Sequence, residues 1–154
     1  MAGVVPLTVA CLLQAAQLQH VPPAVILTVL KVEGGHVGTV SKNTNGSEDL
    51  GPMQVNTSAW LKPVASMHFG GDTKAAYEAL RDNGCYNIHV GTWILRQAID
   101  EAGGNIYEGI GLYNSHTTKY KVRYQSLFRK HFWEMFGPQR TVTADASADQ
   151  KEKR

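Results

Sequence analysis

Hydrophobic residues recur every three or four positions along most of the chain, and this period predicts helices. We expect helices over residues 7–19, 23–33, 57–68, 74–82, 86–102, 105–113 and 118–136. Gly, Pro, Asn, Asp or Thr residues separate these segments, as is typical of helix ends and turns. The alternation of apolar and polar residues that marks a strand is scarce. The pattern therefore predicts an all-α fold.

A polar stretch over residues 34–52 interrupts the helical pattern. It is rich in Gly, Asn, Ser and Thr, and loops of this length in small domains tend to be functional. Asn45-Gly46 favours a tight turn, so one short β-hairpin is compatible with this loop. Apolar residues thin out from Gln139 onward. We expect one domain over residues 1–138 and a disordered tail over 139–154.

The apolar stretch from Val4 to Ala16 has two interpretations. Its end faintly resembles a signal-peptide cleavage site, but no Lys or Arg precedes it, so an export signal is poorly supported. Five residues of this region share one helical face: Leu7, Cys11, Leu12, Ala15 and Leu18. A first structural helix is therefore favoured.

The composition is that of a soluble globular protein, with 43% hydrophobic and 18% charged residues among 154. No apolar run approaches the roughly 20 residues of a membrane span. The net charge of +2 is too small to indicate a nucleic-acid partner, although it weakly suits an anionic wall polymer. None of the six histidines lies in a zinc-binding pattern, so we expect no metal and no cofactor.

Glu33 ends the apolar segment 23–33, immediately before Gly34-Gly35. The C-terminal end of a helix is negative and apolar neighbours disfavour charge, so both effects should raise the pKa of this carboxyl group. A carboxylic acid that stays protonated near neutral pH is what general acid catalysis requires. The alternative is an ordinary solvated residue neutralised by Lys31 or Lys42.

Three further motifs follow in order: Gly51-Pro52-Met53-Gln54-Val55-Asn56, Asn87-(x)3-Gly91 and Tyr113-Asn114. With Glu33-Gly34-Gly35, they resemble the soluble lytic transglycosylases, which share the goose-type lysozyme fold. The chain is similar in particular to the small members that accompany conjugation, secretion and pilus machines. The resemblance covers about residues 7–125 and implies an all-α, lysozyme-like fold.

This resemblance implies a reaction that needs a single carboxyl group. Glu33 would protonate the oxygen of the β-1,4 bond between N-acetylmuramic acid and N-acetylglucosamine in peptidoglycan. As a carboxylate it would then take the proton of the muramic C6 hydroxyl, which attacks C1 and gives a 1,6-anhydro end. Because the nucleophile belongs to the substrate, a high effective molarity replaces an enzyme nucleophile.

The resemblance also assigns roles to neighbouring residues. Gln54 is expected to bind an N-acetyl group or a sugar hydroxyl, and Met53 to line the floor of the groove. Tyr113 is expected to hydrogen-bond Glu33, with Asn114 in the same layer contacting sugar or the loop. Core packing is the structural alternative for Met53 and Tyr113.

Two asparagines have structural alternatives as well. Asn56, a candidate substrate-binding residue, is also a common type of helix cap. Asn87 and Gly91 suit a helix start and a close helix crossing better than substrate binding.

The chain departs from the family pattern in places. Gly34 stands where Ser commonly follows the catalytic Glu, so a hydroxyl near the acid is missing or comes from Ser41 or Ser47. Ile94 stands where a tyrosine is often found. His116 lies in a segment where small residues, including Gly, are usual.

Glu48 and Asp49 keep a second mechanism open. If either faced Glu33 across the groove, the protein could activate water and act as a hydrolytic muramidase. Otherwise both are solvated or ion-paired loop acids. A third possibility is a non-catalytic module that binds wall glycan, although the retained Glu33, Gln54 and Tyr113 argue against it.

By resemblance, the partner is peptidoglycan and the role is local wall opening for an envelope-spanning apparatus. This implies a periplasmic or cell-envelope location, and we expect a monomer that binds no nucleic acid. The chain has two cysteines, Cys11 and Cys85. They are either buried free thiols or, outside the cytoplasm, a disulfide.

Overall fold

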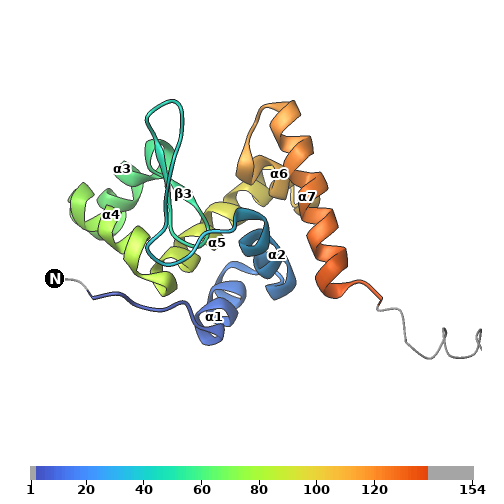
Figure 1. Ribbon diagram of the computed structural model, residues 1–154, viewed down its shortest axis with the longest axis horizontal. Coiled ribbons are helices and arrows are strands. Elements are labelled where there is room, and N and C mark those ends of the chain that lie inside the picture. Colours follow the sequence, from blue (N-terminus) through green and yellow to red (C-terminus); the bar gives the residue numbers. More distant parts are fainter. Residues whose placement is uncertain (1–2, 139–154) are drawn as a thin grey trace, which may run out of the picture.

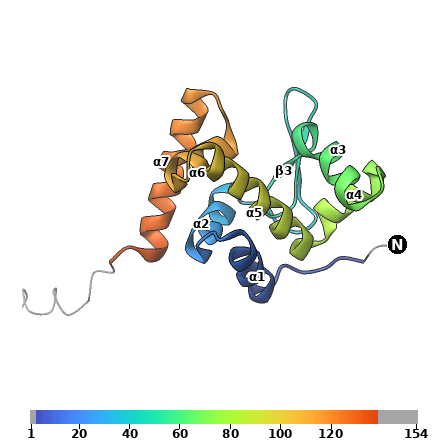
Figure 2. The same ribbon diagram turned by 180° about the vertical axis from the view of Figure 1, so that it is seen from behind.

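The computed structural model describes residues 3–138, and helix α5 (Gly84–Glu101) lies at its centre. Ten residues of α5 are buried, more than in any other helix of residues 3–138. Figures 1 and 2 show α5 passing between two groups of elements. We call these groups the first and second lobes.

The first lobe contains α1 (Val9–Gln19), α2 (Pro23–Glu33), α6 (Ile106–Asn114) and α7 (Thr118–Phe136). They share one hydrophobic core with part of α5. Its buried side chains include Ile26, Val29, Leu95, Ile99, Ile110 and Phe128. Helix α2 ends at a left-handed Gly34 (φ 66°), a conformation that glycine adopts without steric cost.

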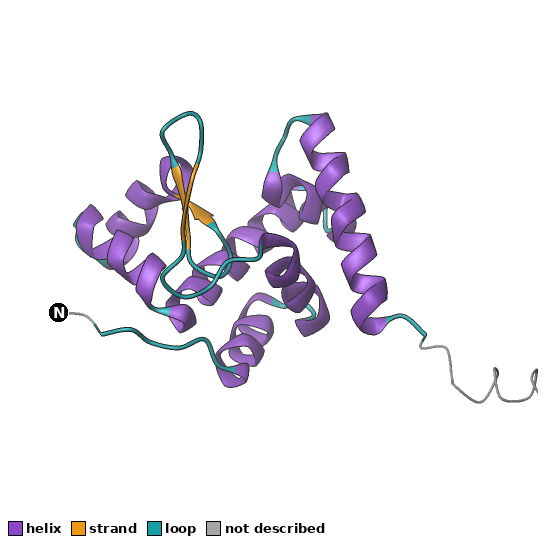
Figure 3. Cartoon of the chain, viewed as in Figure 1, coloured by secondary structure: helices purple, strands orange, loops and turns teal. Residues whose placement is uncertain are grey.

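The second lobe contains a small antiparallel sheet with the order β1 (Val40–Lys42), β2 (Glu48–Leu50) and β3 (Val55–Asn56). Helices α3 (Thr57–His68) and α4 (Thr73–Asp82) complete it. Figure 3 shows these strands in orange; every other regular element of the described residues is a helix. The hairpin anticipated around Asn45-Gly46 is β1–β2, in which Lys42 pairs with Glu48.

The mostly helical architecture confirms the all-α prediction, with a third strand that the sequence did not suggest. Helix α3 continues through Pro63, in agreement with the helix expected over residues 57–68. Leu18 was expected to share one helical face with Leu12 and Ala15, but it is 62% exposed whereas those two residues are buried. The expected tail, 139–154, lies outside the described residues.

Within residues 3–138, no helix is long and apolar enough to span a membrane. The N-terminal segment instead packs along the protein. Val5 forms a β-bridge with Asn83, and the backbone N–H of Gly84 donates to the Val5 carbonyl at 2.7 Å. Cys11 and Cys85 form a disulfide across a sequence separation of 74 residues, with their Cα atoms 5.4 Å apart. The start of α5 is therefore attached to α1 covalently.

Opening this disulfide should lower the free energy of unfolding by roughly 4 kcal/mol, because the crosslink removes loop entropy from the unfolded chain. Urea denaturation with and without dithiothreitol measures the difference. The double variant Cys11→Ser/Cys85→Ser should match the reduced protein and show no response to dithiothreitol. Equal midpoints for the oxidised and reduced wild type would contradict this role.

Candidate active site

A groove of about 980 Å³ lies between the two lobes. In Figure 3 the β1–β2 hairpin and the α6–α7 turn stand on its two sides. The second lobe contributes Lys42, Asn43, Thr44, Asn45, Asp49, Gln54, Asn56 and Trp60. The opposite side contributes Leu112, Tyr113, Asn114, Ser115, His116 and Tyr120. Ile94, Gln97, Ala98 and Glu101 of α5 and Glu33 of α2 also line the groove, with Val55 and Ala59 from the second lobe.

Glu33 is the last residue of α2 and is partly buried at the groove. Burial raises its pKa from 4.5 to about 7; the hydrogen bond from Tyr124 opposes this effect, and the negative charge of Asp49 adds to it. The Tyr124 hydroxyl donates to Glu33 Oε1 at 2.7 Å. The carboxyl group is therefore held in one place and is substantially protonated at neutral pH.

Tyr124, and not the expected Tyr113, is the tyrosine that holds Glu33. The Tyr113 hydroxyl donates instead to the Met53 carbonyl oxygen at 2.7 Å. Burial and the charge of Glu33 keep the pKa of both phenols well above its usual value, so both are neutral donors. The sequence signal for Tyr124 was weak, because the residue sits in an otherwise apolar helical stripe. Its buried hydroxyl nevertheless required a partner.

Asn87 fixes the turn that connects β2 to β3. Its fully buried side chain accepts a hydrogen bond from the Met53 N–H and donates to the carbonyls of Leu50 and Leu80, each at 2.8 Å. Met53 is fully buried against Gly91, where an added Cβ would collide with its sulfur. The prediction that the Met53 side chain lines the groove is therefore wrong, since it fills the core behind the turn.

Gln54 does line the groove, in a left-handed conformation with φ 53°. Its side-chain amide donates to the Gly51 carbonyl at 2.9 Å, which leaves its carbonyl oxygen for another partner. Gly35 is required beside it, because a Cβ there would meet the Gly51 carbonyl and the Gln54 side chain. The Gly-Gly pair after Glu33 thus lets the chain pass close to this turn.

Glu48 and Asp49 point to opposite sides of β2, as successive strand residues do. Glu48 accepts a hydrogen bond from Tyr77 and does not line the groove, so it is not the second acid that we considered. Asp49 faces the groove, and its two oxygens accept hydrogen bonds from Asn56 at 2.7 Å and Asn43 at 3.0 Å. Asp49 is therefore the acid positioned on the wall opposite the α6–α7 turn.

Asn56 has a structural role. Its side-chain carbonyl oxygen accepts a hydrogen bond from the Ala59 N–H and so caps the N-terminus of α3. Asn114 lines the groove at the end of α6 and donates to the Tyr120 carbonyl at 3.4 Å. Neither Ser41 nor Ser47 lines the groove, so the hydroxyl beside Glu33 comes from Tyr124.

His116 Nε2 and Glu101 Oε1 are within hydrogen-bonding distance at 2.7 Å, and both side chains line the groove. Within residues 3–138 no group of three His, Cys, Asp or Glu side chains is placed to hold a metal ion. The groove thus combines a buried acid, a second carboxylate, amide side chains and an indole. Such a combination suits an uncharged, hydroxyl-rich polymer such as a glycan.

A helical fold with one buried glutamic acid in a glycan-sized groove defines the class of lysozyme-like proteins. The chain belongs to the transglycosylase SLT domain family, whose sequence model matches residues 10–136. Family membership confirms the lysozyme-like fold and assigns the chain to the lytic transglycosylases at family level. The substrate of this family is peptidoglycan, which is consistent with a periplasmic or envelope location.

The chain is also similar to the invasion protein IagB of Salmonella typhi, with 26% identity over 145 residues. This match covers 94% of the chain and 83% of the relative. The IagB proteins of Salmonella typhimurium strains SL1344 and LT2 match with the same identity and coverage.

Replacing Tyr124 by Phe should raise the pKa of Glu33 further, because the hydrogen bond from Tyr124 lowers it. Carbon-detected NMR titration of the glutamate carboxyl groups measures this shift directly. Tyr113→Phe is the matched control, since that hydroxyl binds the Met53 carbonyl. An unchanged pKa in Tyr124→Phe, or an equal change in both variants, would exclude the specific role of Tyr124.

Glu33 should destabilise the fold as the pH rises. Its pKa of about 7 in the folded protein exceeds the ordinary glutamate value of 4.5. The unfolded chain therefore releases this proton at a lower pH, and the free energy of unfolding falls as the pH rises between these values. Glu33→Gln should therefore raise the free energy of unfolding by about 2 to 3 kcal/mol at pH 8, with little effect at pH 4. Urea denaturation at both pH values tests this, with Glu78→Gln on α4 as the control. Equal effects of Glu33→Gln at both pH values would contradict the prediction.

Proposed function

We propose that this protein is a peptidoglycan lytic transglycosylase, with residues 1–138 as a single catalytic domain and Glu33 as its general acid and then base. It cleaves the β-1,4 bond between N-acetylmuramic acid and N-acetylglucosamine without water. The single observation that carries this proposal is the pKa of about 7 at Glu33, in a groove of glycan size. A group with that pKa populates both the acid and the base form near neutral pH.

The reaction uses the carboxyl group of Glu33 twice, first as an acid and then as a base. The protonated carboxyl group gives its proton to the glycosidic oxygen as the bond from that oxygen to muramic C1 breaks, and N-acetylglucosamine leaves. The C6 hydroxyl of the muramic sugar then bonds to C1 and returns a proton to the Glu33 carboxylate. The product carries a 1,6-anhydro ring, and the acid is regenerated. Tyr124 holds the carboxyl group in place during both transfers.

Asp49 supports this reaction through its charge. Positive charge develops at C1 as the glycosidic bond breaks, because the transition state resembles an oxocarbenium ion. A carboxylate in the groove stabilises that charge electrostatically. The amides of Asn56 and Asn43 hold Asp49 in place, which gives Asn56 a positioning role instead of the substrate contact first assigned to it.

Other groove residues bind the sugars. The free carbonyl oxygen of Gln54 accepts a hydrogen bond from an acetamido N–H, and Asn114 contacts the sugar on the opposite wall. Trp60 offers an apolar surface to a sugar ring. Ile94, which stands where the family often has a tyrosine, lines the same groove. Tyr113 acts indirectly, because its hydroxyl holds the turn that carries Gln54.

Asp49 also favours a second candidate function, hydrolysis by a muramidase. Lysozyme has the same pair of groups. Its glutamic acid, whose pKa is raised, is the general acid, and its hydrogen-bonded aspartate stays ionised as the nucleophile or electrostatic stabiliser. In that reaction water, and not the C6 hydroxyl, would supply the oxygen bonded to C1. The two functions differ in their products, which makes them separable.

The biological role that we propose is local opening of the wall for an envelope-spanning secretion, conjugation or pilus apparatus. The similarity to proteins named for invasion supports a task at the cell envelope. The protein would act there as a monomer in the periplasm, because one chain supplies the acid, its tyrosine and both groove walls.

Digestion of purified peptidoglycan followed by mass spectrometry of the muropeptides tests this function. We expect 1,6-anhydro ends, a rate that falls as the pH rises above about 7, and a loss of roughly 10²- to 10⁴-fold in Glu33→Gln. Asp49→Asn should slow the reaction without changing its product. Glu48→Gln on the other face of β2 is the matched control and should retain activity.

Reducing ends that vanish in Asp49→Asn would instead establish the hydrolase. An equal product yield from wild type and Glu33→Gln would overturn both assignments.

A further inference from the structure

The positive charge of the described chain is concentrated on one helix. Helix α7 carries five Lys or Arg residues and one acid, Glu134. The remaining described residues carry six Lys or Arg and nine Asp or Glu. The modest net charge of the whole protein therefore conceals a strongly basic α7 on an otherwise acidic domain.

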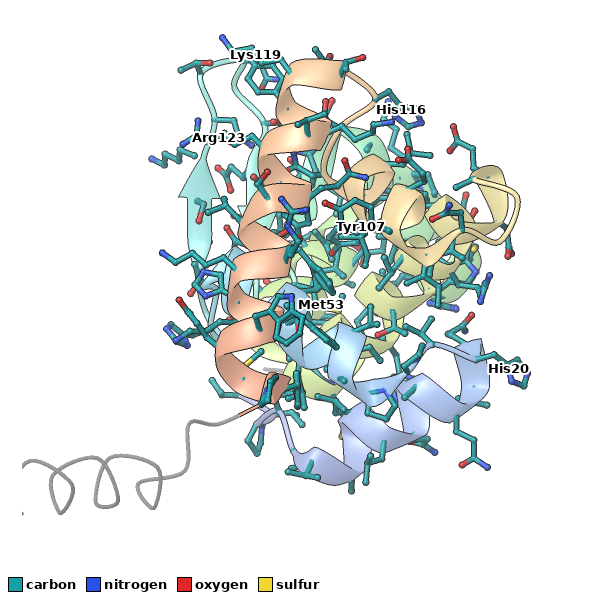
Figure 4. All side chains as sticks on the ribbon, turned by 90° about the vertical axis from the view of Figure 1, so that its right-hand side faces the viewer. His20, Met53, Tyr107, His116, Lys119 and Arg123 are labelled. Atoms are coloured by element: carbon teal, nitrogen blue, oxygen red, sulfur yellow. A yellow bond between two sulfur atoms is a disulfide. The ribbon has the colours of Figure 1, made fainter. Side chains whose placement is uncertain are left out.

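Most of these cations lie on one side of α7, which we call the outer face. It consists of exposed residues spaced three or four apart: Lys119, Val122, Arg123, Ser126, Arg129, Lys130 and Trp133. Residues at such spacing project from the same side of a helix. The buried Tyr124 and Phe128 occupy the opposite side, toward Glu33 and the core. Figure 4 views α7 from outside and shows Lys119 and Arg123 projecting from its first turns.

None of the seven outer-face residues is an acid, although Glu134 lies at the edge of the face, four residues after Lys130; the four cations have no ion-pair partner among residues 3–138. The fifth cation of α7, Lys121, lies off this face and binds Glu108 at 2.7 Å. The only acid of α7, Glu134, accepts from His131 at 3.0 Å. Within residues 3–138 the outer face thus has a clear excess of positive charge along the length of the helix, which makes the face complementary to a polyanionic partner.

Apolar groups stand among these charges. Trp133 is 59% exposed and Val122 is 51% exposed, and both lie between the cations. A tryptophan beside Lys and Arg is typical of protein surfaces that rest at the boundary between water and lipid. None of the seven residues lines the substrate groove. The face is the outside of a single helix, and such a convex surface fits a flat, extended partner better than a small molecule.

We propose that the outer face of α7 binds the anionic phospholipid surface of a membrane. The four cations attract acidic headgroups, and Trp133 inserts its indole among them. Because the face is directed away from Glu33, the groove stays open to glycan while the protein is bound. This inference does not depend on the reaction at Glu33, since no groove residue takes part in it.

Flotation with phospholipid vesicles tests the proposal on the full chain. Binding should occur to vesicles containing phosphatidylglycerol, be absent with phosphatidylcholine alone, and disappear in about 1 M NaCl, which screens charges beyond roughly 3 Å. Arg123→Gln/Lys130→Gln should bind roughly 25-fold more weakly, because each Lys or Arg near an anionic membrane contributes roughly a fivefold change.

The matched control is Lys62→Gln/Lys74→Gln, which removes two exposed lysines from α3 and α4. It should retain wild-type binding with the same change in net charge. Trp133→Ala should bind more weakly and lose the blue shift of tryptophan fluorescence that vesicles induce. Circular dichroism melting of each variant separates lost binding from lost folding.

Binding that is equal for both lipids, or equally weakened in both double variants, would overturn the proposal. The proposal would also be overturned if the wild type did not bind vesicles and Arg123→Gln/Lys130→Gln bound isolated peptidoglycan more weakly than the wild type. That result would assign the outer face to a wall polymer. Repeating flotation with Glu33→Gln keeps the two proposals apart. Vesicle binding should persist in that variant whether or not the wild type yields anhydro muropeptides.

Discussion

The architecture of the site depends on one buried carboxamide, that of Asn87. Its three hydrogen bonds join the central helix to β2, to α4 and to the turn before β3. Each polar atom left unsatisfied in a core costs roughly 1–3 kcal/mol, so the turn cannot leave Asn87 without a substantial penalty. The Met53 carbonyl that accepts from Tyr113 and the Gln54 side chain that faces the groove both belong to this turn. One amide therefore fixes the inner wall of the groove.

The acid itself is made by residues far apart in sequence. Helix α2 supplies Glu33, α7 supplies the tyrosine that holds it, and β2 supplies the negative charge that disfavours its ionisation. Desolvation is the dominant influence on its pKa, and this comes from the collective packing of the first lobe. The catalytic property is thus a product of the tertiary fold, and α2 alone would not generate it.

The sequence predicted what local patterns encode and missed what only packing determines. The helices and the position of Glu33 followed from apolar spacing and from the glycines that end α2. The sequence did not indicate which of Tyr113 and Tyr124 binds Glu33, because both are tyrosines on apolar helices. Only the crossing of α7 over α2 places Tyr124 against the carboxyl group. Glu48 and Asp49 were indistinguishable for a similar reason, since the register of β2 decides which one faces the groove. Met53 was misplaced because its family position says nothing about the direction of its side chain.

The two lobes meet along α5, and the two acids of the groove belong to different lobes. Glu33 is fixed to the first lobe, whereas Asp49 is part of the sheet in the second. The proton affinity of Glu33 therefore depends in part on a charge that the other lobe carries, although burial is the larger influence on its pKa. The chain divides between its two lobes the groups that set the acidity of its catalytic carboxyl group, so the relative placement of the lobes contributes to that acidity.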